Sequence, residues 1–284
     1  MRKYTRREAL KLFGIGTVAV AGIGLVGCSG SGANNGAVTG PSEAPSTSMS
    51  ASQAFFQQNV WMQCSSSDIP EKDTTVQSIL VFDGNGNVTR YETSYAGTNE
   101  NTSYEAPTFG DLDGLSTDEI IELAKKKNRE RFELLQQTSI DETNESLEFY
   151  QQDAGFYQDD IANATEGQKV NEAAEYEEPE AVPFTLAIET DGTGNSTETE
   201  TIEFEAVSLN PGYFYAGSHI GSAPDQFKEE LYKTETKSIE LGITGGQIVY
   251  DTIFGGYTGL YTVIDSWDAS YMLDTPDTEG IEVD

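Results

Sequence analysis

Carboxylate and amide side chains are concentrated in three short loops whose spacing could hold a cation. The loops span residues 83–87, 111–113 and 191–195 and read Asp-Gly-Asn-Gly-Asn, Asp-Leu-Asp and Asp-Gly-Thr-Gly-Asn. Ca²⁺ takes oxygen ligands of this kind, but no EF-hand is complete, because Val88 stands where the first loop needs glycine and Ser94 where it needs glutamate. Ordinary turns have the same composition. If Ca²⁺ binds, we expect Asp111 and Asp113 as its ligands, since they gather beside a predicted helix start. No other cofactor is predicted.

Aromatic residues of the C-terminal third form a second candidate site. Rings that are exposed together could stack on a sugar or an apolar ligand. Aromatic residues also favour the inner face of a sheet, which is the competing interpretation. The ligand-binding hypothesis rests on five of them: Tyr213, Tyr215, Tyr257, Tyr261 and Trp267.

A short basic segment could contact an anion or an acidic partner. Its five members are Lys125, Lys126, Lys127, Arg129 and Arg131. The alternative is a solvated helix face on which Lys126 pairs with Glu122 and Glu130, each four residues away. Such pairs stabilise a helix by a few tenths of a kcal/mol (about 0.2–0.5) without any partner.

Nucleophilic catalysis has little support in this sequence. His219 is the single histidine, and no Ser-His-Asp or Cys-His arrangement surrounds it. Cys64 follows an apolar stretch and is predicted to be a buried thiol. A hydrolase that uses two carboxylates stays open among so many acids, although no pair is distinguished by spacing. Enzyme activity is therefore uncertain and not favoured.

The elements that would position these residues are mainly strands. Two hairpins are predicted around the Asp-Gly-x-Gly-Asn turns, and further strands are expected at 59–64, 238–243, 247–254 and 259–265. Ser116 and Glu119 have the spacing of a capping box, which predicts a helix over 117–136. A second helix is expected at 224–232 and an exposed linker at 164–179. The pattern predicts a mainly β (α+β) fold, an antiparallel sandwich or barrel-like sheet with one long helical insertion.

The N-terminus carries the clearest motif. Arg6 and Arg7 precede a glycine-rich apolar run that ends in Leu-Val-Gly and Cys28. This segment resembles a twin-arginine export signal followed by the lipobox of a bacterial lipoprotein. The resemblance implies that residues 1–27 are a signal peptide, that Cys28 is lipidated, and that the protein lies on the extracytoplasmic face of the membrane. Residues 28–53 are then a flexible stalk, and 54–284 a β-rich exported domain with a weak boundary near 164–182.

Charge and cysteine content limit the partners. The chain has 16 basic and 48 acidic residues and a net charge of −32. Removal of residues 1–27 takes away five basic residues and one acid, which leaves −36. Such a charge excludes general binding of nucleic acid or anionic lipid by the body of the protein. A halophilic source is an alternative explanation of the acidity. With Cys28 acylated, only Cys64 remains, and no intrachain disulfide can form.

These observations favour a lipid-anchored cell-surface binding or accessory protein, with a small molecule or glycan as its ligand. A protein–protein interaction module of an envelope complex is the first alternative, with its contacts through residues 125–131. A carboxylate-based hydrolase is the second. The membrane itself is a partner through the lipid anchor at Cys28.

Overall fold

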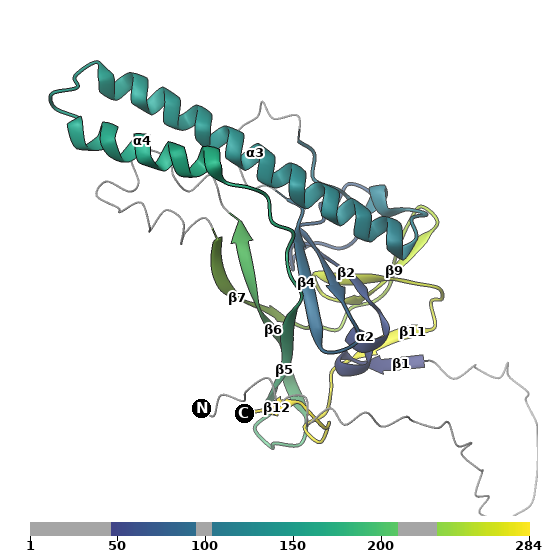
Figure 1. The fold of residues 1–284 in the computed structure, drawn as a ribbon. Coiled ribbons are helices and arrows are strands. Elements are labelled where there is room, and N and C mark those ends of the chain that lie inside the picture. Colours follow the sequence, from purple (N-terminus) through teal and green to yellow (C-terminus); the bar gives the residue numbers. More distant parts are fainter. Residues whose placement is uncertain (1–46, 95–103, 210–231) are drawn as a thin grey trace, which may run out of the picture. The chain divides into compact units, whose positions relative to one another are not determined.

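The structure is a computed structural model that describes residues 47–94, 104–209 and 232–284. Ser46–Asp284 group into one compact unit (Figure 1). Its helices are α2 (Ala51–Gln57), α3 (Thr117–Gln151), α4 (Gln158–Ala173) and the 3₁₀ turn η1 (Phe109–Leu112). Its strands are β1 (Thr47–Ser50), β2 (Val60–Gln63), β3 (Ser78–Phe82), β4 (Asn87–Glu92), β5 (Val182–Thr190), β6 (Thr197–Leu209), β7 (Tyr232–Glu240), β8 (Gln247–Val249), β9 (Thr252–Tyr257), β10 (Leu260–Ile264), β11 (Ala269–Met272) and β12 (Glu282–Val283).

Ten of the described strands form one open sheet in the order β7-β6-β5-β4-β3-β2-β10-β9-β8, with β12 beside β5. All pairs are antiparallel except β12 with β5. The predicted mainly β class with a long helical insertion is confirmed. The sheet is not closed, so the barrel-like alternative is wrong. The link between its two halves is narrow, because β4 and β5 pair through two residues on each strand.

Two hydrophobic cores lie on opposite faces of the central strands. In the first, Trp61, Leu80 and Tyr257 pack with side chains of β5 and β6 and with α2. In the second, residues such as Met62 and Phe254 pack against η1 and the first turns of α3. Alternation along each strand sends neighbouring side chains to different cores. One face of the central strands is therefore covered by α3, and the other by side chains of β5 and β6 together with α2.

The turns of the two predicted hairpins form as expected. Asp83 accepts hydrogen bonds from the backbone N–H of Asn85 and of Asn87 at 2.7 and 3.1 Å, which closes the β3–β4 turn. Asp191 accepts in the same way from Thr193 and Asn195 at 3.1 and 3.3 Å between β5 and β6. Burial acts to raise the pKa of Asp83, but the hydrogen bonds outweigh it and hold that pKa below its ordinary value.

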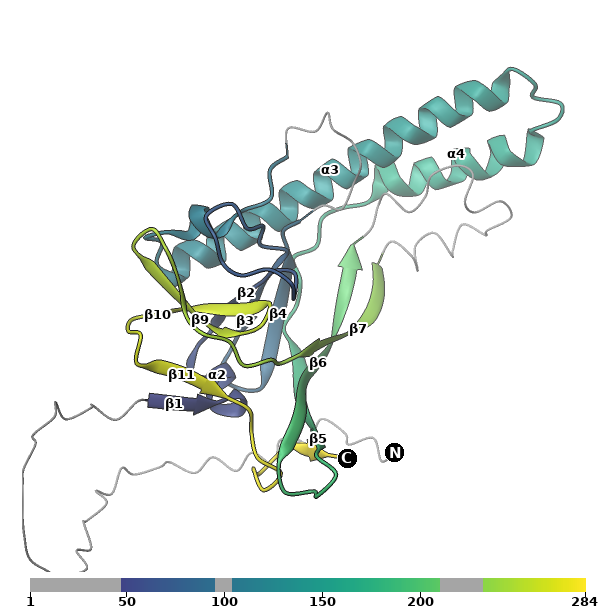
Figure 2. The same ribbon diagram turned by 180° about the vertical axis from the view of Figure 1, so that it is seen from behind.

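Helix α3 begins as predicted and continues much further. Ser116 is its N-cap, and its hydroxyl accepts from the Glu119 N–H while the Glu119 carboxylate accepts from the Ser116 N–H at 2.8 Å. The helix ends at Gln151 and not near residue 136. Helix α4 includes residues 164–173 of the stretch predicted as a linker, so that prediction is wrong there, while residues 174–179 have neither helix nor strand. The two helices lie side by side as an antiparallel hairpin (Figures 1 and 2).

Regular structure is also present before position 54. Residues 47–53, expected to belong to the stalk, form β1 and the start of α2. Strand β1 pairs in parallel with β11, from Thr47 opposite Ala269 to Ser50 opposite Met272, and Met49 packs against the first core. The small residues of this segment are ordered by pairing with the C-terminal region, which local composition does not reveal.

Candidate interaction surface on the helical hairpin

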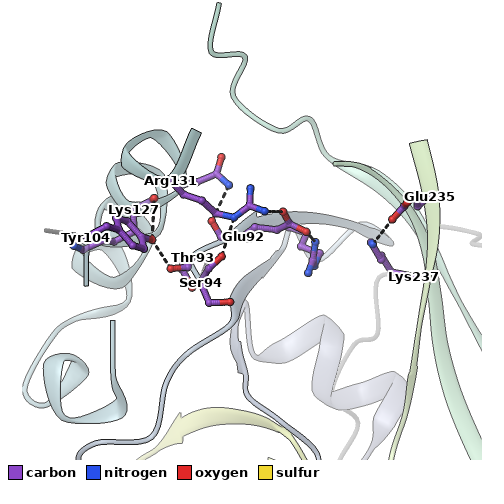
Figure 3. A network of polar contacts seen from close by, with 10 residues as sticks. Glu92, Thr93, Ser94, Tyr104, Lys127, Arg131, Glu235 and Lys237 are labelled. Carbon is purple, nitrogen blue, oxygen red and sulfur yellow. Dashed lines mark hydrogen bonds and ion pairs between the residues drawn. The ribbon is translucent and has the colours of Figure 1, made fainter. Parts of the chain in front are cut away.

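The base of the hairpin is fastened to the sheet by a charged network (Figure 3). Glu92, at the end of β4, forms ion pairs with Arg90 and with Arg131 of α3, the latter at 2.9 Å. Arg131 also donates from Nε to the Ser94 carbonyl at 2.8 Å. Burial acts to raise the pKa of Glu92, but the two guanidinium groups outweigh it and hold that pKa below its ordinary value. These contacts orient α3 across β4.

Asn128, one helical turn before Arg131, also holds α3 against the sheet through hydrogen bonds. It is 6% exposed, and its Nδ2 donates to the Glu92 carbonyl at 2.9 Å. Its Oδ1 accepts from the Tyr176 hydroxyl at 2.9 Å, in the segment after α4. Burial raises the pKa of Tyr176 to about 12, so the hydroxyl keeps its proton. The asparagine that interrupts the apolar face of α3 thus joins this helix to the sheet and to the segment that follows α4.

The side chains of the predicted basic segment make intramolecular contacts. Lys125 pairs with Glu178 at 3.3 Å, Lys126 with Glu130 at 3.7 Å, and Lys127 with Glu130 at 3.0 Å. The Arg129 guanidinium lies 4.3 Å from the centre of the Tyr176 ring, and Arg131 belongs to the Glu92 network. The structure therefore favours the structural interpretation of residues 125–131, with contacts that reach beyond the helix itself.

Beyond its base, the hairpin has a seam of small and polar residues. Asn171 of α4 donates from Nδ2 to the Ser139 hydroxyl at 2.8 Å, and Gln136 of α3 donates from Nε2 to the Asn171 carbonyl at 2.6 Å. Ser139 and Thr143 of α3 and Ala164 and Gly167 of α4 are buried with them. Small side chains let the two helices approach closely, yet they bury little apolar surface.

The tip of the hairpin exposes aromatic rings. We define the tip as residues 149–157, where α3 ends and α4 begins. Phe149 is 56% and Phe156 76% exposed, the latter the highest value among the large hydrophobic residues identified as exposed. Phe156 and Tyr157 are 4.8 Å apart between ring centroids, and Tyr150 and Tyr157 are 5.0 Å apart. An apolar cluster at the end of a long hairpin is typical of a contact surface.

The predicted cation ligands are held by the protein itself. Asp111 accepts from the N–H and hydroxyl of Thr108 at 2.8 and 2.9 Å in the capping box of η1. Asp113 accepts from the Asp251 N–H at 3.1 Å and the Thr252 hydroxyl at 2.8 Å. The two carboxylates serve different neighbours, and the described residues contain no group of three or more His, Cys, Asp or Glu side chains placed to hold a metal ion.

The predicted aromatic site is dispersed where it is described. Tyr257 and Tyr261 are both 0% exposed, and they lie in the first and the second core respectively. Trp267 is 57% exposed, in the loop between β10 and β11. Tyr213, Tyr215, the helix expected at 224–232 apart from Tyr232, and His219 lie outside the described residues, as do Arg6, Arg7 and Cys28. Cys64 is buried, and burial raises its pKa to about 11.

Two carboxyl groups do meet, although inside the protein. Glu200 of β6 is 0% and Asp274 2% exposed, and the Asp274 N–H donates to Glu200 Oε2 at 2.7 Å. The Asp274 carboxylate accepts from the N–H and hydroxyl of Ser52 at 2.6 and 2.7 Å. Burial is the largest cause that raises the pKa of Glu200 to about 8, and the charge of Asp274 adds to it. The pair joins α2, β6 and the C-terminal segment, and both groups are shielded from solvent.

Neither the tip nor this carboxyl pair is predicted from the sequence. Two aromatic doublets, Phe149-Tyr150 and Phe156-Tyr157, lie on either side of Asp153-Ala154-Gly155, a sequence with turn-forming residues that is the available signal for a helical turn. Glu200 shares a strand face with Ile202 and Phe204, two apolar residues at alternate positions of β6, and that alternation is the available signal for its burial.

Comparison with known proteins adds no relative. No protein-family model, curated protein or solved structure matches this chain. Within the parts of the chain that the structure describes, no helix combines the length and apolar character needed to cross a membrane.

Proposed function

We propose that this chain is a lipid-anchored cell-surface protein whose helical hairpin contacts another protein of the cell envelope. The exposed aromatic tip carries the proposal. Phe149 and Phe156 would cost free energy in water, at about 25 cal/mol per Å² of apolar surface left unburied. Aromatic side chains are enriched where proteins bind one another, and they dominate the energy of such contacts.

The two other hypotheses have weaker support. A small-molecule or glycan site needs several exposed rings together, whereas Tyr257 and Tyr261 fill separate cores. A hydrolase needs two carboxylates that reach a substrate, whereas Glu200 and Asp274 are buried and bonded to main-chain and serine donors. The basic segment, first considered as the contact region, is occupied by internal partners. The tip carries the most exposed large apolar side chain among the described residues, Phe156, together with Phe149.

Lipidation is tested by replacing Cys28 with serine. Without the thiol no diacylglyceryl group can be attached, so the mature protein should move from the detergent phase to the aqueous phase in Triton X-114 partition of whole cells. The matched control is Cys64→Ala, which removes the other thiol and should leave the protein in the detergent phase. A Cys28→Ser protein that still partitions into detergent would contradict the anchor.

The contact surface is tested by photo-crosslinking in intact cells. A benzoylphenylalanine at position 156 should give a discrete adduct with another protein under ultraviolet light. The same residue at position 207 on β6, where Val207 is 49% exposed on the sheet, should give none. Adducts at both positions, or at neither, would contradict a specific contact through the tip.

A further inference from the structure

The tip presents its rings in an ordered arrangement. Backbone N–H groups of Gln152 and Asp153 donate to the carbonyls of Phe149 and Tyr150, each at 3.2 Å. Those of Phe156 and Tyr157 both donate to the Asp153 carbonyl, at 3.0 and 3.1 Å. The turn is therefore closed by its own hydrogen bonds, and its backbone loses little conformational freedom on binding. Preorganisation of this kind favours affinity.

Charge along the hairpin is divided sharply between base and outer part. The basic residues of α3 all lie at or before Arg131. From residue 132 to residue 168 the chain has nine Asp or Glu and no Lys, Arg or His. Around the rings, Glu148, Asp153 and Asp159 are exposed. Among the described residues of the outer hairpin, 132–168, every charged side chain is thus a carboxylate, while the basic side chains near the sheet are engaged with internal partners.

This distribution discriminates among possible occupants. A second copy would bring its own carboxylates against these, and like charges in contact cost free energy. An anionic membrane surface would be repelled for the same reason. A protein surface that carries lysine or arginine around an apolar recess would gain both ring burial and charge complementarity, and it would associate faster because opposite charges steer the encounter.

We propose that the hairpin tip docks into a basic protein surface with an apolar recess, the recess taking Phe149 and Phe156 and the basic rim facing the surrounding carboxylates. This inference rests on the proposed function, because it names the partner of the same surface. The rings supply most of the affinity, and the carboxylates supply partner choice and rate.

The test uses the full mature chain with Cys28→Ser and a synthetic 18-residue helical peptide that has leucines on one face and lysines on the other. Titration calorimetry should give a dissociation constant in the micromolar range at low salt, weakening as salt is added. Oligolysine with the same number of lysines should bind at least tenfold more weakly. If it binds equally well, the rings take no part and the proposal fails.

Matched variants locate the contact. The Phe149→Ser, Phe156→Ser double variant should raise the dissociation constant at least tenfold, and Trp267→Ser, which removes an exposed ring elsewhere, should change it less than twofold. Glu148→Gln, Asp153→Asn and Asp159→Asn together should weaken binding about tenfold at low salt. The equal charge change on exposed acids of β6, Glu198→Gln, Glu203→Gln and Glu205→Gln, should have less than a twofold effect.

The outcomes separate this inference from the proposed function. Equal weakening by the two triple variants would mean that the overall charge of the protein attracts the peptide. That result would overturn the proposal that the tip recognises a basic surface. Sedimentation of the wild type with anionic phospholipid vesicles, lost in the Phe149, Phe156 variant, would assign the tip to a membrane and also overturn it. A crosslink from position 156 in cells that persists when the three tip acids are neutralised would keep the proposed function and reject the basic partner.

Discussion

Replacing Gly256 with alanine is expected to lower the free energy of unfolding by about 4 kcal/mol or more, which for many domains abolishes folding. Gly256 lies in β9 with φ +147°, a conformation that residues with a side chain rarely adopt. A Cβ atom there would stand 2.4 Å from the Leu260 carbonyl oxygen and 2.8 Å from the Trp61 ring. The carbonyl belongs to the paired strand β10 and the indole to the first core, so neither can withdraw without loss elsewhere.

Urea unfolding followed by circular dichroism measures this effect. Gly192→Ala is the matched control, because a Cβ at Gly192 has no atom within 4 Å and its φ is not positive. That variant should unfold at the wild-type urea concentration or slightly above it, since alanine restricts the unfolded chain. Equal midpoints for both variants would contradict the close packing of β9 against β10 and Trp61.

Glu200→Gln is expected to make the protein markedly more stable at alkaline pH while changing little at pH 5. In the folded protein the pKa of Glu200 is raised to about 8 from an ordinary value of 4.5, chiefly by burial. A folded state that holds a proton more tightly than the unfolded state is favoured at low pH. Its contribution to stability is complete below about pH 4.5 and is lost as pH rises through about 8. Glutamine keeps the uncharged form and the acceptor for the Asp274 N–H at every pH.

The loss in the wild type amounts to roughly 3–5 kcal/mol between these limits. Thermal unfolding from pH 5 to pH 9 should therefore show a steep fall for the wild type and a shallower one for Glu200→Gln, with the curves meeting near pH 5. Glu203→Gln makes the same substitution on the exposed face of the same strand and should follow the wild type. Parallel curves for all three proteins would show that Glu200 ionises without a penalty in the folded state.

The features predicted correctly from the sequence are those whose interactions join residues only a few positions apart. The Asp83 and Asp191 turns, the capping box of Ser116 and Glu119, and the apolar alternation of β6 all follow from residues a few positions apart. The second half of α3 could not be predicted in this way. Residues 137–151 have no continuous apolar face, and their helix is stabilised by α4 through contacts such as Ser139 with Asn171, which are 32 positions apart.

The candidate site was harder to predict for the same reason. Arg131 and Glu92 belong to different elements, and the sequence offered nearer glutamates as partners for the basic segment. Tyr257 and Tyr261 were attractive as ligand-stacking rings because they are close in sequence. A four-residue spacing across the tight turn between β9 and β10 instead places them on opposite faces of the sheet. The tip is formed where α3 and α4 meet, so predicting it requires both helices.

The parallel pairing of β1 with β11 has a mechanical consequence. The chain segment that follows Cys28 enters the described part of the domain at Thr47, so a pull from the proposed lipid anchor against the proposed partner of the hairpin would reach β1 first. The β1–β11 ladder joins Thr47–Ser50 to Ala269–Met272, with its hydrogen bonds across the strand direction. A pull along β1 loads those bonds together, in shear, and does not open them one at a time. Ser52, bonded to Asp274 immediately afterwards, is the second point that resists the load.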